Sequence, residues 1–212
     1  MIITYLGKSL IKIQSGDMVI ALNPYIKDGD KKGPKFGADI VLLSRQDDEY
    51  GAVDNMTYGN KIPFVADGPG EYDVSDIHIQ GVLTNAEGRA SKEYPLNTAF
   101  MVFVDGMRVC HLGALRDPHL DTSTKETLGE IDVLFVPVGG DGVIDAKEAH
   151  KIVTALEPKI IIPVSFSGAS DKQLEIFLKE LGEESQKREP KVVLKKKDID
   201  EKEGEVLVLE AQ

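Results

Sequence analysis

Short segments rich in apolar and β-branched residues dominate the first third of the chain, and they are separated by sequences that favour turns. Strands are predicted at residues 2–5, 10–14 and 18–22, between Gly-Lys and Ser-Gly-Asp turns. Residues 39–43 form a nearly continuous apolar run, which is typical of a strand covered on both faces. Two more strands are predicted at residues 63–66 and 77–82, and residues 67–73 between them are expected to form turns.

The second half repeats this pattern and adds helices. Residues 98–104 and 107–112 flank Asp105-Gly106, which is the strongest hairpin signal in the chain. Buried strands are predicted at residues 132–138 and 159–164. A helix capped by Asp145 is expected to extend to Leu156, and a second covers residues 171–181. Residues 183–190 are expected to form a charged linker, followed by closing strands at residues 191–195 and 205–209.

These elements predict an α/β protein in which antiparallel runs of strands are followed by a few helices. Two mixed β-sheets packed face to face, with helices on their outer faces, would bury the apolar strands in a four-layer αββα arrangement. With 212 residues and no internal composition break, the chain is expected to form a single domain over residues 1–212.

Composition narrows the classes of partner and compartment. The formal net charge of −11, from 25 basic and 36 acidic residues, disfavours binding to nucleic acid. We interpret the run Lys195, Lys196 and Lys197 as a solvated strand end. No apolar run is long enough to span a membrane, and the amino terminus does not have the pattern of a secretory signal. Because Cys110 is the only cysteine, no intrachain disulfide is possible, and a reducing cytoplasm is the expected location.

Seven local segments go further than periodicity, because they occur in one order across residues 1–181. They are residues 3–9 (ITYLGKS), 19–25 (VIALNPY), 38–44 (ADIVLLS), 68–74 (GPGEYDV), 109–113 (VCHLG), 132–140 (DVLFVPVGG) and 158–164 (PKIIIPV). Together they resemble the metallo-β-lactamase superfamily, and most of all its cytoplasmic branch similar to the lactonase that opens L-ascorbate 6-phosphate. The resemblance implies the αββα fold and a zinc-dependent hydrolase.

The zinc-binding residues of that family are missing at the matching positions. After the strand at residues 39–43 the family carries His-x-His-x-Asp-His, whose imidazoles and carboxylate hold zinc and activate a bound water. Here Arg45, Asp47 and Tyr50 replace the three histidines, and Glu49 replaces the aspartate. No histidine lies within residues 84–87, where the family has another ligand.

The later ligand positions differ as well. Ala114 stands where the family has its bridging aspartate, and Ser165 where it has its last histidine. Lys8 and Asn23 replace a histidine and an aspartate of two earlier motifs. The resemblance therefore implies zinc, while the residues present predict that no zinc is bound.

Of the four histidines, only His111 ends a strand beside these loops, either lining the cleft or packed as a supporting residue. The acidic run Asp47, Asp48 and Glu49 leaves three alternatives open. It forms an internal salt-bridge cluster with Arg45, a weak site for Mg²⁺, Mn²⁺ or Ca²⁺, or a new catalytic site.

Three functions follow from these residues. The first, which we favour, is a pseudoenzyme that keeps the scaffold and binds an unidentified small molecule or protein, with no residue in a firm catalytic role. The second is a metal-dependent hydrolase of phosphodiesters, lactones or related esters, using a site rebuilt around the three carboxylates and His111. The third is an architectural subunit that forms an oligomer.

Overall fold

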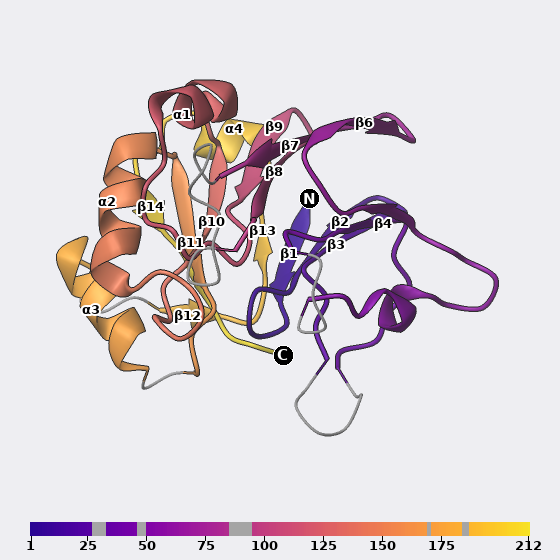
Figure 1. The fold of residues 1–212 in the computed structure, drawn as a ribbon, viewed down its shortest axis with the longest axis horizontal. Coiled ribbons are helices and arrows are strands. Elements are labelled where there is room, and N and C mark those ends of the chain that lie inside the picture. The colour runs from indigo at the N-terminus through magenta and orange to yellow at the C-terminus, as the bar shows by residue number, and fades with distance from the viewer. Residues whose placement is uncertain (27–32, 46–49, 85–94, 169–170, 184–186) are drawn as a thin grey trace.

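The computed structural model describes residues 1–26, 33–45, 50–84, 95–168, 171–183 and 187–212. Two β-sheets pack face to face, and most of the helices lie on the outer side of the second sheet (Figure 1). This is the α/β arrangement of two mixed sheets flanked by helices that the sequence predicts. None of the helices in these ranges is long and apolar enough to cross a membrane.

The first sheet holds six strands in the order β13-β1-β2-β3-β4-β5. Their bounds are Val192–Val193 for β13, Ile2–Tyr5 for β1, Ile11–Ser15 for β2, Met18–Leu22 for β3, Ile40–Leu42 for β4 and Phe64–Ala66 for β5. Strands β3, β4 and β5 are mutually parallel, whereas the other pairs are antiparallel.

The second sheet holds seven strands in the order β14-β11-β10-β9-β8-β7-β6. Their bounds are Glu205–Val206 for β14, Ile160–Val164 for β11, Val133–Pro137 for β10, Met107–His111 for β9, Thr98–Val104 for β8, Ile77–Leu83 for β7 and Gly70–Val74 for β6. Strands β9, β10, β11 and β14 are parallel. The turn from β8 to β9 has positive φ at both Asp105 and Gly106, as the hairpin prediction requires. A short third sheet pairs β12 (Arg188–Glu189) with β15 (Val208–Leu209).

The two longest helices in the described ranges begin at side-chain caps. Helix α2 (Ala146–Leu156) starts with a capping box, in which Asp145 accepts from the backbone of Glu148 and the Glu148 carboxylate accepts from the backbone of Asp145. Helix α3 (Lys172–Glu180) is capped by Asp171. Both helices pack their apolar faces into the main hydrophobic core, which also fills the space between the sheets. The outer face of the first sheet is covered by the 3-10 helix η1 (Val53–Met56) and residues around it, through Met56.

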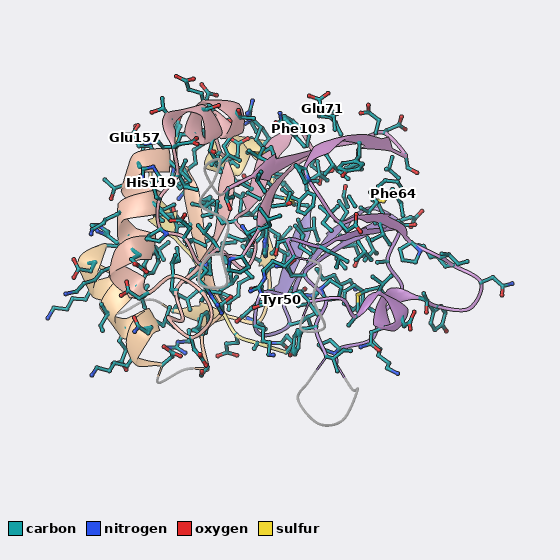
Figure 2. The ribbon with its side chains drawn as sticks, viewed as in Figure 1. Tyr50, Phe64, Glu71, Phe103, His119 and Glu157 are labelled. Carbon is teal, nitrogen blue, oxygen red and sulfur yellow. The ribbon has the colours of Figure 1, made fainter. Side chains whose placement is uncertain are left out.

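Several details differ from the sequence prediction, including strand β12, which lies within the expected linker at residues 183–190. Residues 70–74 form the edge strand β6, where turns were expected, and α1 (Thr122–Leu128) was not expected at all. Lys196 and Lys197 belong to the short helix α4 (Lys196–Ile199), so the prediction of a solvated strand end is wrong. The two edge strands on one side, β5 and β6, carry Phe64 and Glu71 respectively (Figure 2).

Candidate functional site

The loops that follow β3, β4, β9, β10 and β11 gather at one end of the two sheets. Within each sheet these strands run parallel, so their carboxyl ends meet at the same edge. The loop after β4 touches the loop after β9, because the backbone N–H of Ala114 donates to Ser44 Oγ at 3.1 Å. The described positions that the resemblance matches to zinc ligands lie at this end of the molecule.

An apolar cluster occupies part of this end. The Tyr50 side chain, only 4% exposed, packs with Ala114 and Val143 into a small hydrophobic cluster of its own. The guanidinium carbon of Arg45 lies 5.8 Å from the centroid of the Tyr50 ring. The sequence-predicted residues Arg45, Tyr50 and Ala114 are thus brought together by packing and a cation–π contact.

A buried polar network surrounds Ser44. Asn23 Nδ2 donates to Ser44 Oγ, and the backbone N–H of Ser44 donates to Asn23 Oδ1, both at 2.8 Å. A side chain at Gly113 would not fit, because its Cβ would lie 2.4 Å from the Cβ of Ser44. Glycine also tolerates the φ of +73° found there. Ser44 and Asn23 therefore hold two loops together with hydrogen bonds that are satisfied within the protein.

His111 is buried in the core rather than exposed on a cleft. Its Nδ1 accepts from the backbone N–H of Gly113 and its Nε2 donates to the carbonyl of Ser9, each at 2.9 Å. Burial lowers the pKa of His111 from 6.5 to about 4, and the hydrogen bond to Ser9 offsets this only in part. With both nitrogens engaged and the ring neutral, His111 is not placed to act as a general base.

Ser165 lies where β11 ends and is bonded to the turn between β1 and β2. Its hydroxyl is 2.6 Å from the hydroxyl of Ser9, and its backbone N–H donates to the carbonyl of Lys8. Ser165, Lys8 and Asn23 all have a positive φ, a conformation that costs free energy for residues other than glycine. A Cβ added at Gly139 would lie 1.9 Å from the carbonyl oxygen of Ser165, so the chain just after β10 runs directly beside Ser165.

These described residues do not fit a zinc ion. The polar groups of Ser9, Ser165, Asn23 and Ser44 are hydrogen-bonded to one another, and both nitrogens of His111 are occupied. Ala114 and Val143 carry no donor atom, and they pack against Tyr50. No group of three His, Cys, Asp or Glu side chains within the described ranges could hold a metal ion. Asp47, Asp48 and Glu49 lie outside those ranges.

A cavity of about 570 Å³ opens beside this site. It is lined by Ser44, Arg45, Asp67, Gly68, Pro69, Leu83, Pro95, Leu96 and Thr98. Its walls are mostly apolar, with one cationic and one anionic side chain, so it is suited to a small molecule or a peptide side chain rather than to a bare ion.

This architecture is shared with proteins of known family. Residues 2–165 match the model of the beta-lactamase superfamily domain. The chain belongs to that superfamily. A Thermotoga maritima protein assigned as a Zn-dependent hydrolase of the metallo-beta-lactamase superfamily is 30% identical, with a TM-score of 0.76 over 99% of both chains.

Curated relatives agree with this assignment. A UPF0173 metal-dependent hydrolase of Lysinibacillus sphaericus is 25% identical over 78% of this chain and 85% of its own length. A UPF0173 protein of Pyrococcus furiosus is 32% identical over 52% of this chain, a match that spans about half (49%) of that relative's own length. The chain is therefore a metallo-beta-lactamase-fold homologue of metal-dependent hydrolases. These similarities do not identify the L-ascorbate 6-phosphate lactonase branch, which stays a prediction.

Sequence reasoning located several of these positions but missed the polar residues that connect them. Ser44 and Ser9 were not candidates, because serines in loops carry no signal by themselves. Asn23 was noted only as a replacement for an aspartate. The left-handed φ of Asn23 is the feature that a sequence could have suggested, since asparagine adopts it more readily than most residues.

Proposed function

We propose that this protein is a non-catalytic member of the superfamily, which binds a small molecule or a protein and does not hydrolyse an ester with zinc. The observation that carries this proposal is a buried hydrophobic cluster in which Tyr50 and Ala114, at two positions that the resemblance matches to zinc ligands, pack with Val143. Ala114 has no donor atom to bridge two ions, and at Tyr50 the imidazole that zinc favours is replaced by a phenol whose ring packs in this cluster.

The neighbouring cavity supports a binding role. It lies beside Ser44 and Arg45, and apolar walls formed by Pro69, Leu83 and Leu96 offer contact area to a ligand. A ligand could contact these apolar walls and the charged side chains of Arg45 and Asp67 without a metal ion. The ligand is therefore expected to be recognised by the cavity that lies next to the former catalytic loop.

Metal stoichiometry tests the proposal. Elemental analysis of the purified chain, before and after incubation with Zn²⁺ or Mn²⁺ followed by gel filtration, is expected to find well under one firmly bound ion per chain. Hydrolysis of bis(p-nitrophenyl) phosphate is expected to stay at the rate of the buffer containing the same ion. One ion per chain with a measurable hydrolytic rate would contradict the proposal.

A pair of variants distinguishes the alternative, a site rebuilt from carboxylates. Asp47→Ala combined with Glu49→Ala should leave metal content and rate unchanged, and should change the free energy of unfolding by about 0–1 kcal/mol, as for an exposed charge cluster. Glu126→Ala combined with Glu130→Ala removes the same charge from the exposed surface of α1 and the loop after it. Loss of a bound ion in the first double variant but not in the second would establish the rebuilt site.

A further inference from the structure

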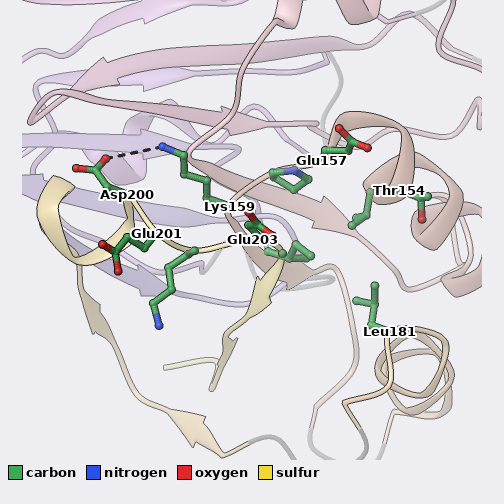
Figure 3. Close-up of a pocket in the computed structure, with 12 residues that line it drawn as sticks. Thr154, Glu157, Lys159, Leu181, Asp200, Glu201 and Glu203 are labelled. Carbon is green, nitrogen blue, oxygen red and sulfur yellow. Dashed lines mark ion pairs between the residues drawn. The ribbon is translucent and has the colours of Figure 1, made fainter.

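A second cavity, of about 680 Å³, lies at the other end of β11 from Ser165. Figure 3 shows it between the end of α2, the start of β11, Leu181 and residues 200–204. Its volume falls within the range of about 300–1,000 Å³ that is typical of small-molecule sites. We propose that this cavity binds a small organic amine that has an aliphatic body.

The wall of the cavity is aliphatic where α2, α3 and β11 meet. Val153, Pro158 and Ile161 are buried, and Leu181 is half-buried just after α3. Such a surface contacts methylene groups and contributes affinity in proportion to the apolar area that it covers. The aliphatic wall does not distinguish charged from neutral ligands. The preference of the cavity for a ligand of one charge therefore depends on the residues at its rim.

The rim has an excess of negative charge. Its carboxylates are Glu157, Asp200, Glu201 and Glu203, and its two ammonium groups are Lys159 and Lys202. Lys159 lies 2.9 Å from the carboxylate of Asp132 and 3.8 Å from that of Asp200 (Figure 3 draws the latter pair), and Lys202 pairs with Glu205. Both ammonium groups are therefore neutralised by carboxylates, including two that do not line the cavity.

The three remaining carboxylates are available to a ligand. Among the residues that the structure describes, no ion pair involves Glu157, Glu201 or Glu203, and all three side chains belong to exposed residues. A protonated amine placed among them would gain charge-assisted hydrogen bonds that the protein does not supply.

Helix α2 adds an independent contribution to the same preference. It is 11 residues long, has no basic residue in its last turn, and has Glu157 as its C-cap beside the cavity. The carboxyl end of a helix carries partial negative charge, which attracts cations. A ligand amine near Glu157 would therefore meet the helix dipole as well as the carboxylate.

Backbone hydrogen bonds join one wall of the cavity to the start of β11. The N–H of Gly204 donates to the carbonyl of Pro158 at 3.1 Å, and the N–H of Glu205 donates to the carbonyl of Lys159 at 2.9 Å. Gly204 and Glu205 are thus fixed against the start of β11 before a ligand arrives. A preformed site loses less conformational entropy on binding than one that must be ordered by its ligand.

The test is an NMR titration of the full chain with octamethylenediamine at low salt. Saturable shifts are expected in the backbone amides of Glu157, Lys159, Glu201 and Gly204. The neutral octamethylene glycol should bind about tenfold more weakly, because it lacks the charges that the rim recognises, and the dianion suberate should cause no saturable shift. Equal binding of diamine and glycol, or shifts that do not saturate, would overturn the proposal.

Matched variants separate this site from general attraction to an acidic protein. Glu201→Gln combined with Glu203→Gln should weaken diamine binding about fivefold or more. Glu126→Gln combined with Glu130→Gln makes the same change in net charge on and beside α1, away from the cavity, and should leave the affinity within about twofold of wild type. Equal weakening in the two double variants would show that only net charge matters and would refute the site. All four glutamates are exposed, so both variants are expected to fold.

Discussion

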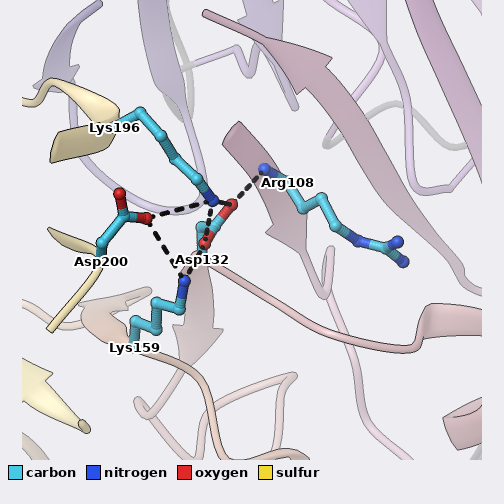
Figure 4. Close-up of polar contacts among 5 residues, drawn as sticks. All are labelled: Arg108, Asp132, Lys159, Lys196 and Asp200. Carbon is cyan, nitrogen blue, oxygen red and sulfur yellow. Dashed lines mark hydrogen bonds and ion pairs between the residues drawn. The ribbon is translucent and has the colours of Figure 1, made fainter. Parts of the chain in front are cut away.

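Replacing Asp132 by Ala is expected to lower the free energy of unfolding by about 3 kcal/mol, because a buried carboxylate with several charged partners is lost. The Asp132 side chain is only 6% exposed. Its two oxygens lie 2.9 and 2.8 Å from Nζ of Lys196, and one of them is 2.9 Å from Nζ of Lys159. The backbone N–H of Arg108 also donates to it at 2.9 Å (Figure 4). Removing the carboxylate leaves that N–H without its acceptor.

Asp200 provides the matched control. It lies near the same two lysines, 3.8 Å from Lys159 and 3.7 Å from Lys196, but its side chain is 52% exposed. Asp200→Ala should therefore cost only about 0–1 kcal/mol. Urea unfolding followed by circular dichroism measures both variants. Equal losses would mean that the contacts of Asp132 contribute no more than a surface ion pair.

The pH dependence of the Asp132 contribution has a defined sign. Burial raises the pKa of this carboxyl, but the hydrogen bonds from Lys196, from the backbone of Arg108 and from Lys159 together lower it below 3.8. Because the pKa is lower in the folded state than in the unfolded state, the ionised carboxyl stabilises the protein fully when the pH is above the unfolded-state pKa. This stabilisation is lost as the pH falls through the folded-state pKa. The difference between wild type and Asp132→Ala should therefore shrink in strong acid.

The Asp132 cluster also shows what a sequence does not reveal. The strand that follows Asp132 was predicted from its apolar run, and so was the strand that follows Lys159. Lys196 was interpreted as part of a solvated strand end, yet its ammonium is bonded to a carboxylate 64 positions earlier in the chain. Local periodicity carries no information about such a contact, because it depends on how α4 packs against the second sheet.

Strand β6 was missed for a different reason. Its residues Gly70–Val74 include two glutamate or aspartate side chains and a glycine with φ of +150°, and none of the five is buried. Composition of this kind favours turns. The strand exists because β7 supplies its hydrogen-bond partners over all five residues, so tertiary pairing overrides local preference.

The candidate site could be located from the sequence, but its packing could not. The resemblance predicts that Arg45, Tyr50, Ala114 and Ser165 stand at ligand positions of the family, and the structure places both Arg45 and Ala114 against Tyr50. Whether a Tyr at such a position lies buried or exposed depends on Val143, which comes from another loop. The residue types at these positions could be read from the sequence, whereas the packing of Tyr50 against Ala114 and Val143 is seen only in the fold.

Acidification from pH 6.5 to 4 is expected to lower the free energy of unfolding by about 3 kcal/mol through His111 alone. In the folded protein burial lowers the pKa of His111 to about 4, whereas the unfolded chain titrates near 6.5. Between these values the unfolded state binds a proton that the folded state does not, so stability rises with pH across this window. In the folded protein Nδ1 accepts a hydrogen bond from the N–H of Gly113. A proton on Nδ1 would point at that N–H, and the hydrogen bond would be lost.

His111→Gln should remove this slope, whatever its effect on absolute stability, because the variant has no imidazole to titrate. Chemical unfolding at several pH values between 4 and 7 gives the difference in free energy between wild type and variant, and this difference should change by about 3 kcal/mol across the window. His119→Gln, in the loop before α1, is the control for replacing an exposed histidine while His111 stays in place. A difference in free energy between wild type and His111→Gln that stays constant across the window would mean that the buried imidazole is not the group that titrates.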